Sequence, residues 1–269
     1  MEDNNALDNQ STELRSDLGV LILMQTKTDY GIDGVRRYIV NLLTALGLRG
    51  VKTVVVYNDR DEFFTKLIDQ GFDVRYIPFP RPHPRTLLNL KQRRTIKKHI
   101  QHIIDTENIS IIHAQIPYLI DFVDRSWGCP IYCPQLAGFP KPKPIEFFSP
   151  KLLLHPRKLV GAWYRKNVTL NFKRADIVLS LSEAGIETSQ KVYGISSSQT
   201  VLVTQGIPPA SPTANPNKFR NELNIGDQET LVICVARVTR DKGVEEFGEV
   251  ARRIGQSGKN IRFAFIGIH

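Results

Sequence analysis

The chain has 269 residues with a formal net charge of +9, and 41% of its residues are hydrophobic and 23% charged. These values are typical of a globular protein of one or two domains. No apolar run approaches the roughly 20 residues that a membrane-spanning helix needs, which excludes a transmembrane protein. Residues 1–17 are rich in Asp, Asn, Glu and Ser and lack the basic and apolar regions of a signal peptide. We therefore expect a disordered tail on a cytoplasmic protein.

The first regular elements form a β-α-β unit. The apolar run from Leu18 to Met24 predicts a strand buried on both faces. Apolar residues then recur at helical spacing from Val35 to Leu46, and Gly50 is well placed to end this helix. Val54–Tyr57 repeats the pattern of a buried strand.

Short β-rich runs continue to alternate with helical patterns up to residue 208. The runs begin at Asp73, Ser110, Pro130, Asp176 and Thr200, and the helical patterns lie around 60–70, 86–107, 117–126, 158–174 and 183–192. This alternation predicts an α/β domain over residues 18–208, with a doubly wound, mainly parallel sheet of the Rossmann-like type. Two proline-rich stretches, 78–84 and 134–150, are expected to be irregular surface loops.

A second, shorter unit follows a linker. A stretch dense in Pro, Ser and Ala indicates the linker, which we assign to residues 209–228. Residues 229–269 then predict a buried strand at 231–236, a helix at 241–256 and a strand at 261–266, the start of an incomplete second Rossmann-like domain. One helix cannot cover both faces of a strand pair, so we expect little independent stability.

A basic patch lies in the first domain. Between Phe79 and Ile104 the chain has seven basic residues and no acidic one. The simplest interpretation is a helix over 86–107 that packs on the core and exposes its charged face to water. The alternative is docking on an anionic membrane surface. Nucleic-acid binding is disfavoured, because the helix has no interleaved aromatic residues and charge is its only support.

No metal site or cofactor is expected. The cysteines, Cys129, Cys133 and Cys234, have no C-x-x-C spacing, and the six histidines are scattered. H-E-x-x-H does not occur, so the chain lacks this metal-ligand pattern.

Four segments follow one another in a recognisable order: Thr28–Leu42, Ala175–Glu183, Val203–Pro208 and Val235–Gly243. Together they resemble glycosyltransferase family 4, the retaining enzymes of GT-B fold. In that family a glycine-containing turn begins the first helix, an Ala-Asp segment forms a later strand, an Asn-Gly-Val/Ile hinge joins the domains, and Gly-Arg-x-x-x-x-Lys-Gly opens the second domain.

The resemblance implies transfer of a hexose from a nucleotide-sugar to a glycan or lipid-linked acceptor with retention of configuration and without a metal. Arg237 and Lys242, at the junction of strand and helix where anions bind in open α/β sheets, would hold the donor diphosphate. Gly31 and Gly34 would form a glycine loop that lets the backbone approach a ligand. His113, at a strand end, would either contact the acceptor or serve as a packing residue.

The sequence also departs from the family pattern. Ala137 stands where the family has a histidine, so the catalytic residues are undetermined. The paired glutamates that contact the donor in the family have no counterpart before His269. We therefore expect a polypeptide that is incomplete as a single chain, with little turnover unless a second polypeptide or a longer version of the gene completes the donor domain. The alternative is a non-catalytic protein that binds a glycan or an anionic lipid, peripheral at the inner face of the membrane.

Overall fold

The computed structural model describes residues 18–25, 34–80, 89–135, 166–204, 206, 215–256 and 260–267. The chain divides into two compact units, Met1–Pro208 and Pro209–His269. The expected tail at 1–17, Gly31, Ala137 and most of the two proline-rich loops lie outside the described residues.

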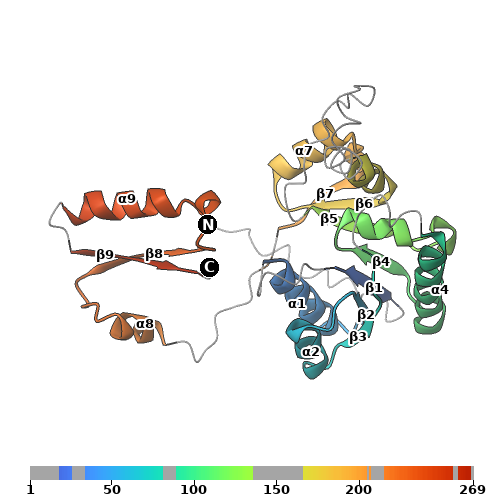
Figure 1. Cartoon of the computed structure of the whole chain (residues 1–269), viewed down its shortest axis with the longest axis horizontal. Coiled ribbons are helices and arrows are strands. Elements are labelled where there is room, and N and C mark those ends of the chain that lie inside the picture. The colour runs from blue at the N-terminus through green and yellow to red at the C-terminus, as the bar shows by residue number, and fades with distance from the viewer. Residues whose placement is uncertain are drawn as a thin grey trace, which may run out of the picture. The chain divides into compact units, whose positions relative to one another are not determined.

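The first unit is built on a seven-stranded sheet in which all the described pairings are parallel. The spatial order of its strands is β3-β2-β1-β4-β5-β6-β7. Their bounds are β1 Gly19–Met24, β2 Lys52–Tyr57, β3 Asp73–Tyr76, β4 Ile111–Ala114, β5 Ile131–Gln135, β6 Ile177–Ser180 and β7 Thr200–Leu202. The predicted doubly wound α/β fold is confirmed (Figure 1).

Helices cover both faces of this sheet. They are α1 Gly34–Gly47, α2 Glu62–Asp69, α4 Leu90–Glu107, a helix described over 166–174, and α7 Glu183–Tyr193. Alternate residues of β1 belong to two separate cores. Val20, Ile22 and Met24 pack with α1 and α2, whereas Leu21 and Leu23 belong to the core that includes α4. This alternation explains why the whole of β1 is apolar, because both faces of a central parallel strand are buried.

One element differs from the expectation. The predicted helix at 117–126 is a pair of 3-10 helices, η1 Pro117–Phe122 and η2 Arg125–Trp127.

At the start of β1, a Cβ added to Gly19 would lie 2.4 Å from the carbonyl oxygen of Asn108. The start of β1 therefore requires glycine, because the end of α4 passes directly beside it.

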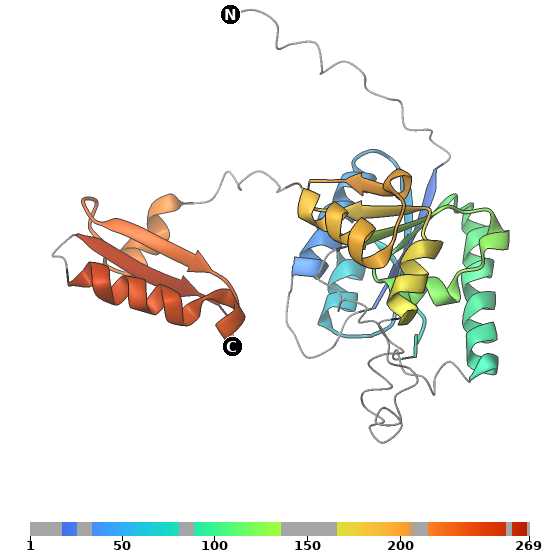
Figure 2. The ribbon, with the colours of Figure 1, turned by 90° about the horizontal axis from the view of Figure 1, so that it is seen from above.

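The second unit contains α8 Pro216–Glu222, β8 Thr230–Val235, η4 Arg240–Lys242, α9 Val244–Gly255 and β9 Ile261–Ile266. β8 and β9 pair in parallel, and α8 and α9 lie on opposite sides of the strand pair (Figures 1 and 2). Helix α8 lies inside the range that we assigned to the linker.

The prediction that residues 231–236 form a buried strand is wrong for this unit. Ile233 and Val235 of β8 are 44% and 75% exposed. The long helix α9 covers one face, where Phe247 contacts Phe263 and Phe265 of β9 with ring centroids 5.8 and 5.6 Å apart. The other face has only the two-turn helix α8, so apolar side chains there keep contact with water.

Candidate functional site

The carboxyl edge of the seven-stranded sheet carries a set of buried and half-buried polar side chains. The strand order reverses between β1 and β4, and in open α/β sheets ligands bind beyond the carboxyl ends of the strands at this point. Gln25 directly follows β1, His113 is the last but one residue of β4, and Gln115 directly follows β4. Gln135 is the last residue of the next strand, β5.

His113 is buried and uncharged at neutral pH. Its side chain is 5% exposed and stacks on Tyr38 of α1, with ring centroids 6.0 Å apart. Burial lowers the pKa of His113 to about 4, because an imidazolium would lose its hydration there. Burial, and secondly the neighbouring Cys133, raise the pKa of Tyr38 to about 12. His113 Nε2 has no hydrogen-bond partner, so its role as acceptor contact or packing residue stays a prediction.

The glutamines at this edge differ in how their amides are satisfied. Gln135 Oε1 accepts hydrogen bonds from Ser180 Oγ at 3.0 Å and from Ser189 Oγ at 2.5 Å. Gln115 is 1% exposed, yet neither its Oε1 nor its Nε2 has a partner, and Gln25 Oε1 is likewise buried without one. Sequence reasoning missed Gln25 and Gln115 as candidate site residues. Their position directly after two central strands was the signal that could have identified them.

Gly34 is the first residue of α1. A Cβ added there would meet nothing within 4 Å, and its φ is outside the left-handed region. The fold of the described residues therefore does not require glycine at this position, in contrast to Gly19. Its predicted role in a glycine loop stays a prediction.

Arg237 and Lys242 lie together in the second unit, where β8 ends and α9 begins. Both approach the same carboxylate oxygen, with Arg237 Nη2 and Lys242 Nζ each 3.8 Å from Asp241 Oδ2. Their side chains are 53% and 43% exposed. An exposed ion pair at this distance contributes about 0–1 kcal/mol, so a diphosphate would meet little competition from Asp241.

The backbone at the same place suits an anion. Gly243 occupies the N-cap of α9 with φ 71°, and no side chain caps this helix end. Its first N–H groups are therefore not satisfied by a capping side chain, and the helix dipole adds a partial positive charge. Glu245 and Glu246 in the first turn of α9 would repel a bound anion. The attraction for an anion must therefore come mainly from Arg237 and Lys242.

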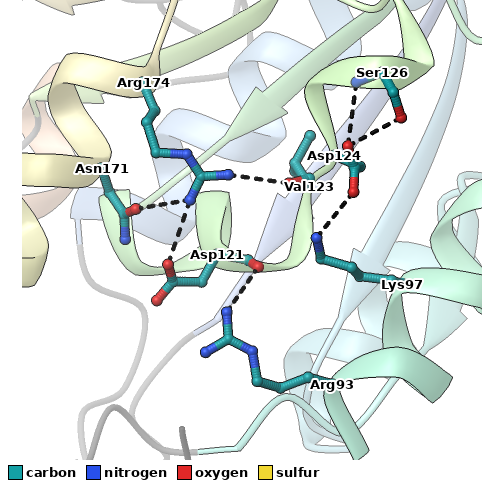
Figure 3. A network of polar contacts seen from close by, with 8 residues as sticks. All are labelled: Arg93, Lys97, Asp121, Val123, Asp124, Ser126, Asn171 and Arg174. Atoms are coloured by element: carbon teal, nitrogen blue, oxygen red, sulfur yellow. Dashed lines mark hydrogen bonds and ion pairs between the residues drawn. The ribbon is translucent and has the colours of Figure 1, made fainter. Parts of the chain in front are cut away.

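The basic patch is only partly available for binding. Arg93 Nη2 donates to the carbonyl oxygen of Asp121 at 3.2 Å, and Lys97 Nζ lies 3.2 Å from Asp124 Oδ2 (Figure 3). These two side chains hold α4 against η1 and the residues that follow it. Ile96, Ile100, Ile103 and Ile104 are buried, so the prediction of a core-packed helix is confirmed. Lys91, Arg94 and Lys98 remain exposed on α4.

The figure also shows how Asp121 is held. Its side chain is 9% exposed and accepts from Asn167 Nδ2 at 3.1 Å, while Arg174 Nη1 lies 3.5 Å from Oδ1. Arg174 also donates to Asn171 and to the carbonyl oxygen of Val123 (Figure 3). This network joins η1 to the helix described over 166–174 and serves packing.

Two negative findings in the described part of the chain bear on the class of protein. Within those ranges, no group of three or more His, Cys, Asp or Glu side chains could hold a metal ion. In the same residues, every helix is too short or too polar to span a lipid bilayer.

Comparison with known proteins adds the family. Residues 32–211 match the model of "Glycosyltransferase Family 4". No curated protein matches the chain.

Solved structures that are similar include a glycosyltransferase from Rickettsia africae ESF-5, with a TM-score of 0.65, 13% identity and 93% of this chain covered. The chain spans 60% of the length of that structure. Anabaena Alr3699/HepE, solved with UDP and glucose, has a TM-score of 0.56 and 13% identity, and 93% of this chain and 69% of that one are covered. At such identities the structural likeness shows the GT-B fold alone.

Proposed function

Since the chain belongs to glycosyltransferase family 4, we propose that it acts in the transfer of a hexose from a nucleotide-sugar to a glycan or lipid-linked acceptor, with retention of configuration. The observation that carries the proposal is the placement of Arg237 and Lys242 on either side of Asp241, at the start of α9. Two exposed cations beside a helix end without a side-chain cap form a setting for a diphosphate.

The donor is proposed to be a nucleoside diphosphate sugar. The similar Anabaena protein has been solved with UDP, with UDP-glucose, and with UDP and glucose. Arg237 and Lys242 would neutralise the negative charge that develops on the diphosphate as it leaves the sugar. Gly34 would let the backbone at the start of α1 approach a ligand in the first unit, because glycine has no side chain to keep the ligand away. The fold of the described residues leaves this space open.

The donor half is proposed to be completed by further strands and helices, supplied either by a second polypeptide or by a longer version of this chain. Ile233, Val235 and Ile266 share one face of the β8–β9 pair and are 44%, 75% and 38% exposed. A partner that adds strands and helices would remove this apolar surface from water, at about 25 cal/mol for each Å² buried. The chain alone is then expected to bind the donor nucleotide more readily than it turns over.

Peripheral attachment to an anionic membrane surface is a second proposal, which would bring the protein to a lipid-linked acceptor. Lys91, Arg94 and Lys98 recur at intervals of three and four residues, so they point from the same side of α4, and all three are exposed. The same surface favours a non-catalytic anionic-lipid-binding protein as the alternative function, should the nucleotide site prove inactive.

The proposed donor site is tested by calorimetry on the full chain with UDP, GDP and ADP, and with the matching nucleosides. We expect at least one diphosphate to bind with a dissociation constant at least tenfold lower than that of its nucleoside, because the diphosphate provides the charge that the two cations recognise. Equal affinity for diphosphate and nucleoside, or no binding of either, would contradict the proposed function.

A further inference from the structure

An apolar groove opens on the surface of the first unit, at the opposite end of the strands from the site described above. The carboxyl end of α1 and the turn before β3 form it, and its lining includes Val40, Leu43, Leu48 and Phe72. Its volume is about 390 Å³, within the range of pockets that hold a ligand. Leu48 is 83% exposed, more than any other large hydrophobic side chain in the described part of the chain. Such a surface favours the binding of a further segment.

The chain enters the sheet on the same face as this groove. Side chains of β1 alternate between the two faces, and Val20 and Ile22 belong to the core beneath α1 and α2. Leu18 follows the same alternation and packs against that core, as Val40 and Phe72 of the groove do. The residues that precede Leu18 therefore start from the face of the sheet on which the groove lies.

The distance from β1 to the groove is short. Strand β2 lies between β1 and β3, and Phe72 directly precedes β3. Two strand spacings, roughly 10 Å, therefore separate Phe72 from the start of β1. Leu14 lies four residues before Leu18 and can extend roughly 13 Å from it. Leu14 can thus reach the groove while Leu18 keeps its place in the core.

The segment before β1 also complements the surroundings of the groove in charge. Residues 1–17 contain five acidic residues and one basic residue. Arg49 lies just beyond α1, and Lys66 lies one turn before Gln70, which also lines the groove. Both cations are exposed, and neither forms an ion pair among the described residues. Asp69 offsets part of this charge. An acidic segment with a leucine anchor therefore fits an apolar groove with cations beside it.

We propose that the segment before β1 folds back along this end of the sheet and seats Leu14 against Leu48, with its acidic residues beside Arg49 and Lys66. The occupant of the groove is then part of the same polypeptide. A docked segment would replace the disordered tail that the composition of residues 1–17 predicts. This inference goes beyond the proposed function and is independent of the nucleotide and of the acceptor.

The test is a double-mutant cycle on the full chain, followed by thermal unfolding. Leu14→Ser and Leu48→Ser are each expected to lower the thermal midpoint by about 2–4 °C, because each removes one apolar partner of the same contact. The double variant is expected to fall no further than either single variant, since the second substitution has no contact left to remove.

Leu90→Ser is the matched control. Leu90 is 61% exposed at the start of α4, which packs on the other face of the sheet, so its effect should add to that of Leu14→Ser. The inference is overturned if Leu14→Ser leaves the midpoint unchanged, if its effect adds fully to that of Leu48→Ser, or if the Leu90→Ser pair deviates from additivity by as much. A dimer in sedimentation that Leu48→Ser dissociates and Leu14→Ser does not would assign the groove to a second copy, and would equally overturn it.

Discussion

The imidazole of His113 in β4 lies against the phenol ring of Tyr38 in α1, with planes inclined by 28°. This contact joins the first helix of the domain to the strand beside the switch point. It also buries both titratable groups, which lowers the pKa of His113 to about 4 and raises that of Tyr38 to about 12. The two rings are therefore neutral over the whole physiological range.

The first prediction concerns acid stability. The folded-state pKa of His113 lies below its unfolded value of about 6.5, so the unfolded chain binds the extra proton. Protonation of His113 in the unfolded chain therefore lowers the free energy of unfolding as the pH falls from about 6.5 to about 4. At pH 5 the loss due to this residue is about 2 kcal/mol.

Urea unfolding of wild type and His113→Phe at pH 7 and pH 5 measures this loss. Phenylalanine retains a ring against Tyr38 but cannot be protonated, so we expect the drop between the two pH values to be about 2 kcal/mol smaller in the variant. An identical drop in both proteins would show that His113 does not carry the effect.

The second prediction concerns Asp61. Its Oδ2 lies 2.6 Å from Arg36 Nη2 and accepts from the Tyr57 hydroxyl at 2.9 Å, while its Oδ1 caps α2 by accepting from the N–H of Phe64. Asp61→Ala removes the cap of α2 and an ion-pair partner of the buried Arg36 together. We expect a loss of about 2–5 kcal/mol in urea unfolding.

Asp69→Ala is the control for that substitution. Asp69 is the exposed last residue of the same helix, and its loss is expected to change stability by less than about 0.5 kcal/mol. Equal effects of the two substitutions would contradict the role given to Asp61.

The third prediction separates two glycines. Gly19→Ala would place a Cβ 2.4 Å from the carbonyl oxygen of Asn108, so the backbone of β1 or of the end of α4 must move. We expect a loss of several kcal/mol, in the range of about 2–4. Gly34→Ala meets no atom within 4 Å and should change stability by less than about 1 kcal/mol. Thermal unfolding of both variants measures these losses. A Gly19→Ala variant as stable as the wild-type chain would contradict the close approach of Asn108 to the start of β1.

The fourth prediction concerns the exposed basic residues of α4. Replacing Lys91, Arg94 and Lys98 with glutamine should weaken binding to vesicles containing anionic lipid by roughly 100-fold at low salt, since each contributes about 1 kcal/mol near such a surface. Flotation with phosphatidylserine vesicles measures the effect. Glutamine at Arg49, Lys66 and Lys191 removes the same charge elsewhere and is expected to have little effect. Equal loss in both variants would indicate a general effect of net charge.

Much of the fold could be predicted because its signals are local. The continuous apolar run of β1 and the helical spacing that follows it identify a central parallel strand and its crossover helix from neighbouring residues alone. The exposure of β8 could not be predicted in this way. Val235 has the sequence environment of a buried strand, but burial depends on which other elements cover that face.

The site was predicted less completely for a similar reason. Arg237 and Lys242 were identified from their spacing, and the structure brings both to Asp241. Gln115 was not identified, because an amide looks the same in a sequence whether or not its partners exist elsewhere in the fold. Lys97 illustrates the converse. Sequence reasoning counted it as part of a basic surface, whereas in the structure it pairs with Asp124.

The central claim is that Arg237 and Lys242 hold the diphosphate of the donor, and its most direct measurement is calorimetry of nucleoside diphosphate binding in substituted chains. Arg240 is the natural control, because it lies between them in the sequence, is 86% exposed and pairs with Glu245. We expect Arg237→Ala and Lys242→Ala each to weaken binding by about 10- to 100-fold, as loss of a charge-assisted hydrogen bond should, and Arg240→Ala to change it by less than twofold. Equal weakening in all three variants, or none in the first two, would contradict the account.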